Sequence, residues 1–129
     1  MTLDSSALVA ILFNEPERVE YNQLIDQDPN CLISTVSVLE TSMVVESRLG
    51  SDANSDIDLF LHRAHIHVVP FDTDQLGMAR WAFRKYGKGR HRAGLNFGDC
   101  AAYALSQWSG EPLLFKGTDF GATDVARVT

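Results

Sequence analysis

The chain has 129 residues, 45% of them hydrophobic and 22% charged, which is ordinary for one folded domain spanning residues 1–129. Its longest apolar run, Ala7 to Phe13, is far shorter than the roughly 20 residues of a membrane span, so we expect a cytoplasmic protein without membrane association. The net charge of −6 argues against a surface that binds nucleic acid over its whole extent.

Residues 1–3 form a short apolar segment that predicts a strand, and Ala7 to Phe13 predicts a helix. Asp4 would then stand at the carboxyl end of the strand, where open α/β sheets bind their ligands. Asp is also a common N-cap residue, so Asp4 has two interpretations, a helix cap and a site residue.

A second helix is predicted to begin at Glu15 to Glu17, with Pro16 in its first turn, and to close at Asp26 to Asn30. A second buried strand is predicted at Cys31 to Ser34 and a third helix at Thr35 to Leu49. Neither Cys31 nor Cys100 has the spacing of a metal site, so we expect both to be reduced and buried.

Glu40 is the unusual residue of the third helix. A helical wheel places it on one stripe with Val36, Met43 and Val44, which predicts that its carboxylate faces the core. A buried carboxylate is costly unless a cation or a donor meets it, and no basic residue shares the stripe. We therefore favour a functional interpretation over a structural ion pair.

The chain continues with a predicted helix at Ser51 to Ala64, a strand at Ile66 to Val69 and a helix at about Asp72 to Tyr86. His65 and His67 alternate with apolar residues around the strand, so we expect them on the surface.

Positive charge is concentrated between Arg84 and Arg92. This segment holds five of the eleven Lys and Arg, leaving six basic residues against seventeen acids elsewhere. Arg90, His91 and Arg92 form a plausible seat for phosphate, although exposed basic residues also occur in loops without function.

Asp99 follows this loop and opens an amphipathic helix that extends to about Trp108, so it is either a helix cap or a metal ligand. A fourth strand is predicted at Leu113 to Phe115 and a last short strand at Val125 to Thr129. Asp119 follows the fourth strand.

Strands and helices alternate four times, which predicts a largely parallel sheet covered on both faces. The strand ends would bring four carboxylates into one cleft: Asp4, Glu40, Asp99 and Asp119. Such a cluster needs a divalent cation, and all-oxygen ligation suits Mg²⁺ or Mn²⁺.

The segments 3–8, 88–104 and 113–120, together with Glu40, resemble the PIN-domain ribonucleases and, within them, the VapC toxins of bacterial type II toxin–antitoxin systems. The resemblance covers nearly the whole chain. It implies a PIN-like three-layer α/β/α sandwich with a central, mainly parallel sheet of four to five strands. It also implies an Mg²⁺-dependent endoribonuclease toxin that acts on RNA, is neutralised by a cognate antitoxin and forms a homodimer.

Asp4, Glu40 and Asp99 match the three family acids that hold or organise the metal. The usual fourth position falls on Gly117, so Asp119 or Asp124 substitutes for it or the site uses three acids; we choose Asp119.

Ser6 is expected to help position the metal shell, and Arg90, His91 and Arg92 are expected to hold flanking RNA phosphates. The antitoxin would attach an acidic tail to the basic loop or insert an arginine into the acidic cleft.

Two other classes remain open. A phosphoacceptor receiver domain also gathers acids at a sheet edge, and Lys116 resembles its lysine, but it needs an acid pair after the first strand and Asp4 stands alone. A PIN-like binding module with weak catalysis is the other alternative, because Gly117 replaces the fourth acid.

Overall fold

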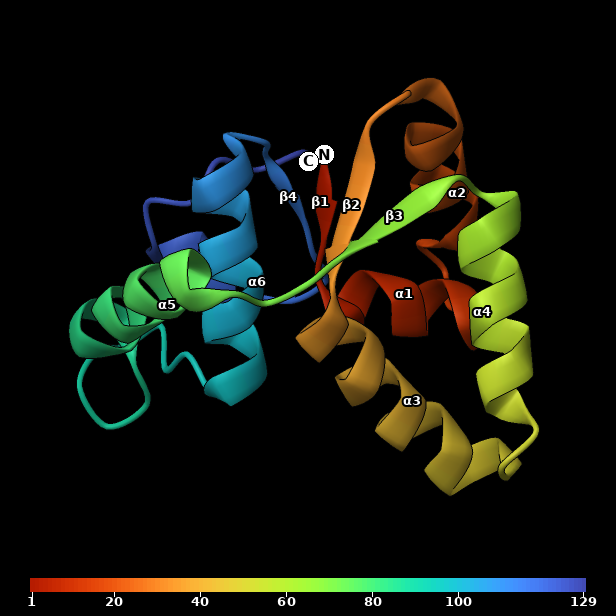
Figure 1. Cartoon of the computed structure of the whole chain (residues 1–129), viewed down its shortest axis with the longest axis horizontal. Coiled ribbons are helices and arrows are strands. Elements are labelled where there is room, and N and C mark those ends of the chain that lie inside the picture. The colour runs from red at the N-terminus through yellow and green to blue at the C-terminus, as the bar shows by residue number, and fades with distance from the viewer.

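The computed structural model describes residues 1–129 (Figure 1). The elements follow in the order β1 (Thr2–Leu3), α1 (Ser5–Leu12), α2 (Arg18–Gln27), β2 (Cys31–Ser34), α3 (Thr35–Leu49), α4 (Ala53–Arg63), β3 (Ile66–Val69), α5 (Thr73–Tyr86), α6 (Phe97–Ser109), β4 (Leu113–Leu114) and the 3₁₀ helix η1 (Asp119–Ala122). The predicted ranges of β2, α3 and β3 are therefore confirmed.

The four strands form one parallel sheet in the order β3-β2-β1-β4. Figure 1 shows α5 and α6 on one side of the sheet and α1, α2 and α4 on the other. This arrangement confirms the predicted three-layer α/β/α fold with a parallel sheet of four strands.

The order of the strands reverses at β1. Thr2 pairs with Leu32 of β2 on one side and with Leu113 of β4 on the other, so the chain leaves β1 in one direction and returns on the opposite side. In open parallel sheets ligands bind at the carboxyl ends of the strands where the strand order reverses. Asp4 follows β1 at this point.

The helix α6 is more deeply buried than the sequence suggested. Every residue from Gly98 to Ser106 is buried, although we predicted an amphipathic helix with one solvent-facing side. The prediction was wrong because α5 covers the side of α6 that does not pack on the sheet, and small residues such as Ala102 and Ala104 allow both contacts.

The predicted last strand is also wrong. Within residues 125–129 only Arg127 makes an isolated parallel bridge, to Leu113. The predictions for the histidines and cysteines are confirmed, since His65 and His67 are exposed and both cysteines are free and buried. None of the helices combines the length and apolar character that a membrane span requires.

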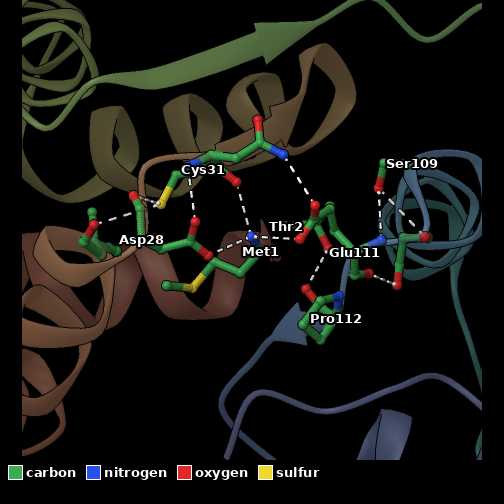
Figure 2. A network of polar contacts seen from close by, with 10 residues as sticks. Met1, Thr2, Asp28, Cys31, Ser109, Glu111 and Pro112 are labelled. Atoms are coloured by element: carbon green, nitrogen blue, oxygen red, sulfur yellow. Dashed lines mark hydrogen bonds and ion pairs between the residues drawn. The ribbon is translucent and has the colours of Figure 1, made fainter.

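A polar network joins the start of β1 to the loops before β2 and β4 (Figure 2). The α-ammonium of Met1 donates hydrogen bonds to Asp28 Oδ2 at 2.6 Å, to the Asn30 carbonyl at 2.9 Å and to Glu111 Oε2 at 3.1 Å. These contacts lie at the amino ends of the strands, at the opposite edge of the sheet from Asp4.

Candidate active site

Asp4 is a helix cap and also retains an unpartnered oxygen. Its Oδ2 accepts a hydrogen bond from the Ser6 amide at 3.0 Å, which starts α1. Its Oδ1 is buried and has no hydrogen-bond partner. Burial raises the pKa of Asp4 to about 6, and the charge of Glu40 adds to that rise, while hydrogen bonds from Ser6 oppose it. Capping therefore uses only half of this carboxylate.

Asp99 lies at the third position of α6 in a capping box. Its Oδ2 accepts from the Asn96 amide at 3.0 Å, and its own amide donates to Asn96 Oδ1 at 2.9 Å. Burial raises the pKa of Asp99 to about 7, partly offset by the Asn96 hydrogen bond, and the charges of Asp4, Asp119 and Glu40 raise it further. The first capping residue is thus Asn96, which we did not predict.

Glu40 lies near Asp4 and Asp99, as predicted, but it does not lie on a buried apolar stripe of α3. The buried side of α3 is formed by Ser37, Thr41 and Val45, whereas Met43 is 63% exposed. The predicted apolar stripe is therefore wrong, and Glu40 is half-buried at its margin. Its Oε1 accepts a hydrogen bond from Ser5 Oγ at 2.5 Å. Ser5 was missed because two adjacent serines give no signal of where each hydroxyl points.

The structure distinguishes the two candidates for the fourth acid. Asp119 begins η1, is exposed, and its charge contributes to the raised pKa of Asp99. Asp124 instead accepts a hydrogen bond from the buried Tyr103 hydroxyl at 2.5 Å. Asp119 therefore lies close enough to Asp99 to affect its ionisation, whereas the Asp124 carboxylate is hydrogen-bonded to Tyr103 of α6.

Ser6 joins the end of β4 to the beginning of α1. Its Oγ accepts a hydrogen bond from the Lys116 amide at 3.0 Å. The Lys116 ammonium lies 3.1 Å from Glu15 Oε1 and 3.2 Å from Glu17 Oε2. Lys116 is thus paired away from Asp4, which is contrary to the role that a receiver domain would give it.

Arg90, His91 and Arg92, the predicted phosphate-binding residues of the basic loop, differ in their surroundings. The Arg90 guanidinium lies 5.2 Å from the centre of the Phe83 ring and lines a groove of about 530 Å³ between α5 and α6, as do Arg80 and Arg84. Arg92 is exposed. His91 is half-buried: its Nδ1 accepts from the Ala93 amide at 3.0 Å, and its ring packs edge-on against Tyr86. His91 therefore shapes the loop.

No basic side chain neutralises the acid cluster. No Lys, Arg or His forms an ion pair with Asp4, Glu40, Asp99 or Asp119. No three of the Asp, Glu, His and Cys side chains are arranged to ligate one ion as they stand. The unpartnered Asp4 Oδ1, the raised pKa values and the oxygen donors nevertheless fit a hard divalent cation, because a bound ion would satisfy the oxygen and reverse both pKa shifts.

Comparison with known proteins identifies close relatives. Residues 1–126 match the model of the PIN domain. The chain is 54% identical to a "Ribonuclease VapC" of Mycolicibacterium smegmatis over 128 residues, which cover 99% of both chains. Among solved structures, it is similar to the sarcin-ricin loop cleaving toxin VapC20 of Mycobacterium tuberculosis, with a TM-score of 0.78, 18% identity and coverage of 98% of this chain and 97% of the other. A toxin-antitoxin complex from Klebsiella pneumoniae gives a TM-score of 0.68 at 17% identity, with coverage of 95% and 92%.

Proposed function

Because this chain belongs to the PIN-domain family and, within it, to the VapC ribonucleases, we propose that it is an endoribonuclease toxin that hydrolyses RNA phosphodiester bonds with Mg²⁺, or Mn²⁺ in its place. The observation that carries the metal dependence is the buried, unpartnered Oδ1 of Asp4 beside an Asp99 that no basic residue neutralises. An oxygen in that environment needs a donor or a cation, and a cation bound among several carboxylates would satisfy the oxygen and offset their mutual repulsion.

Asp4, Glu40 and Asp99 would hold the metal, with Asp119 as the exposed fourth acid. When bound, Mg²⁺ lowers the pKa of a coordinated water and offsets the charge that develops on the scissile phosphate. Glu40 would orient the attacking water and accept its proton on Oε2, since Oε1 already accepts from Ser5. Ser6 would keep Asp4 in place through its link to the end of β4.

Arg90 and Arg92 would bind phosphates that flank the cleaved bond. Both are exposed and lie in the loop that leads directly into α6, whose first turn carries Asp99. His91 would act indirectly, because its Nδ1 is occupied by the Ala93 amide. A local basic surface of this kind attracts a polyanion even on an acidic protein.

The proposal includes a cognate antitoxin, a homodimer and a place of action in the cytoplasm, with which the free buried thiols are compatible. Co-expression with the cognate antitoxin should suppress RNA cleavage. Light scattering of the toxin alone should give twice the mass of one chain, and a mass of one chain would contradict the homodimer.

The decisive experiment measures cleavage of structured RNA by the purified protein with Mg²⁺, with excess chelator, and after Asp99→Asn. Cleavage should require Mg²⁺ and fall at least about 100-fold in the variant, the scale on which transition-state groups act. Asp124→Asn is the matched control, because Asp124 pairs with Tyr103 outside the acid cluster, and it should cleave normally. Cleavage that survives in chelator or in Asp99→Asn would reject the metal nuclease. Antitoxin binding without cleavage of any RNA would favour a PIN-like binding module.

A further inference from the structure

The carboxylate of Glu40 rests directly on the backbone of Gly98. A Cβ built on Gly98 would lie 2.5 Å from Glu40 Oε1 and closer still to Oε2, and these are its nearest neighbours. Apart from atoms of its own residue and the adjoining ones, a Cβ atom essentially never has a heavy atom within 3.0 Å. Glu40 can therefore occupy its observed place only while residue 98 has no side chain.

The backbone conformation of Gly98 does not itself require glycine. Gly94 and Gly110 have positive φ angles of 62° and 74°, but Gly98 is an ordinary residue in the first turn of α6. Glycine within a helix is unfavourable by comparison with alanine because it restricts a more flexible chain. The reason for glycine at position 98 is thus the space that Glu40 fills.

Ser5 holds the same carboxylate from another element. It directly follows Asp4 and donates its hydroxyl to Glu40 Oε1, while Gly98 directly precedes Asp99. Glu40 is thereby located by the immediate neighbours of both other acids. The amino end of α6 also favours a carboxylate at that place through the helix dipole.

We propose that Gly98 and Ser5 are positioning residues that set the Glu40 carboxylate between Asp4 and Asp99. The expected effect on metal binding rests on the proposed metal-dependent function. The effect of Gly98 and Ser5 on the position of Glu40 does not depend on any ion. A methyl group on residue 98 would push the flexible end of Glu40 aside without unfolding α6. The Glu40 carboxylate would then leave its place beside Ser5 and Gly98, the residues that adjoin Asp4 and Asp99.

The first test is a crystal structure of the metal-free Gly98→Ala variant. We expect α6 to keep its backbone and Glu40 to lose its hydrogen bond to Ser5. A Glu40 carboxylate that still accepts from Ser5 in this variant would overturn the proposal, whether or not the protein binds metal.

The second test measures Mn²⁺ affinity by calorimetry. Gly98→Ala should weaken binding about 10- to 100-fold, as changes to groups that orient metal ligands do, with little change in melting temperature. In a Glu40→Ala background the same substitution should have no further effect, because the displaced group is gone. An equal loss in both backgrounds would show that Gly98 acts otherwise than through Glu40.

Two further variants sharpen the result. Gly77→Ala is the matched control: Gly77 also lies within a helix, and a Cβ there would meet nothing within 4 Å. It should leave Mn²⁺ affinity unchanged. Ser5→Ala should weaken binding, and Ser5→Thr, which keeps the hydroxyl, should restore it. If wild-type protein binds no Mn²⁺, the proposed function fails, while the crystallographic test still decides the inference.

Discussion

The carboxylates of Asp4 and Asp99 can each serve two roles, a helix cap and a candidate metal ligand. Asp4 and Asp99 each use Oδ2 to accept a backbone amide that starts or stabilises a helix. The caps hold the carboxylates at defined places without saturating them. Capping and metal binding are thus compatible interpretations of one residue, because a carboxylate has two oxygens and several lone pairs.

Ionised Asp99 should oppose folding of the metal-free protein. Its pKa is raised to about 7, chiefly by burial, so the folded chain binds this proton more tightly than the unfolded chain does. The resulting stability is fully present below the ordinary pKa of about 4 and is lost as pH rises through about 7. Asp99→Asn cannot ionise, yet its amide oxygen can still accept from Asn96.

We therefore predict that Asp99→Asn stabilises the protein in chelator at pH 8. The free energy of unfolding should rise by something on the order of a few kcal/mol, with a higher melting temperature, and both should change little at pH 4. Thermal unfolding at the two pH values checks this. Adding Mg²⁺ at pH 8 should stabilise the wild type and not the variant. An Asn variant equally stabilised at both pH values would show that the charge of Asp99 is not the cause.

At the scale of elements, the two acids that follow β4 have different partners: Asp119 acts on Asp99, and Asp124 is hydrogen-bonded to Tyr103. Asp119→Asn should weaken Mg²⁺ binding and slow RNA cleavage, because its charge acts on Asp99. Asp124→Asn should leave cleavage intact but lower stability by roughly 1 kcal/mol, because the buried Tyr103 hydroxyl loses a charged acceptor.

A double-mutant cycle with Tyr103→Phe isolates that hydrogen bond. In the Phe background Asp124→Asn should cost little. Loss of cleavage in Asp124→Asn at full stability would instead make Asp124 the fourth acid.

Within the basic loop, we expect Arg92 to act through its charge and His91 to stabilise the conformation of the loop. Arg92→Gln should lower RNA affinity and make its dependence on salt shallower by about one counterion, without changing the melting temperature. His91→Ala should lower the melting temperature, because the Ala93 amide and the Tyr86 ring each lose a contact. Filter binding at several salt concentrations, combined with thermal unfolding, distinguishes the two. If the salt dependence of RNA affinity were unchanged in Arg92→Gln, Arg92 would not contact an RNA phosphate.

At the scale of the whole molecule, the two edges of the sheet respond to pH in opposite senses. Partial burial alone would raise the pKa of Asp28, but hydrogen bonds from the Met1 ammonium and the Asn30 amide lower it overall. A carboxylate with a lowered pKa contributes stability above its ordinary pKa, and that stability is lost as pH falls through the folded value.

Asp28→Asn should consequently destabilise the protein at pH 7, by about 1 kcal/mol for a partly exposed pair, and have less effect near pH 3. Urea unfolding at both pH values checks the sign. Glu46→Gln, an exposed acid outside the network, is the control. A larger loss at pH 3 than at pH 7 would contradict the assignment.

Local chemistry in the sequence was sufficient to predict most of the helices and strands and to single out Asp4 and Asp99 as candidate site residues. Period and capping residues predicted α3 and its flanking strands, since these signals depend on neighbours a few residues away. The positions of Asp4 after a strand and Asp99 at a helix start are equally local. The concentration of charge around Arg90 and Arg92 also needs no structure to be seen.

Only the tertiary structure decided which sides of the helices are buried and which polar groups meet. The α3 wheel misassigned the core face, because which face of α3 is covered depends on packing by elements far along the chain. The same is true of Asp119 and Asp124, of the inward turn of His91, and of the contact between Glu40 and Gly98, residues 58 positions apart. A sequence determines which residues can cap, bind or fill space, whereas long-range packing determines which of them lie together.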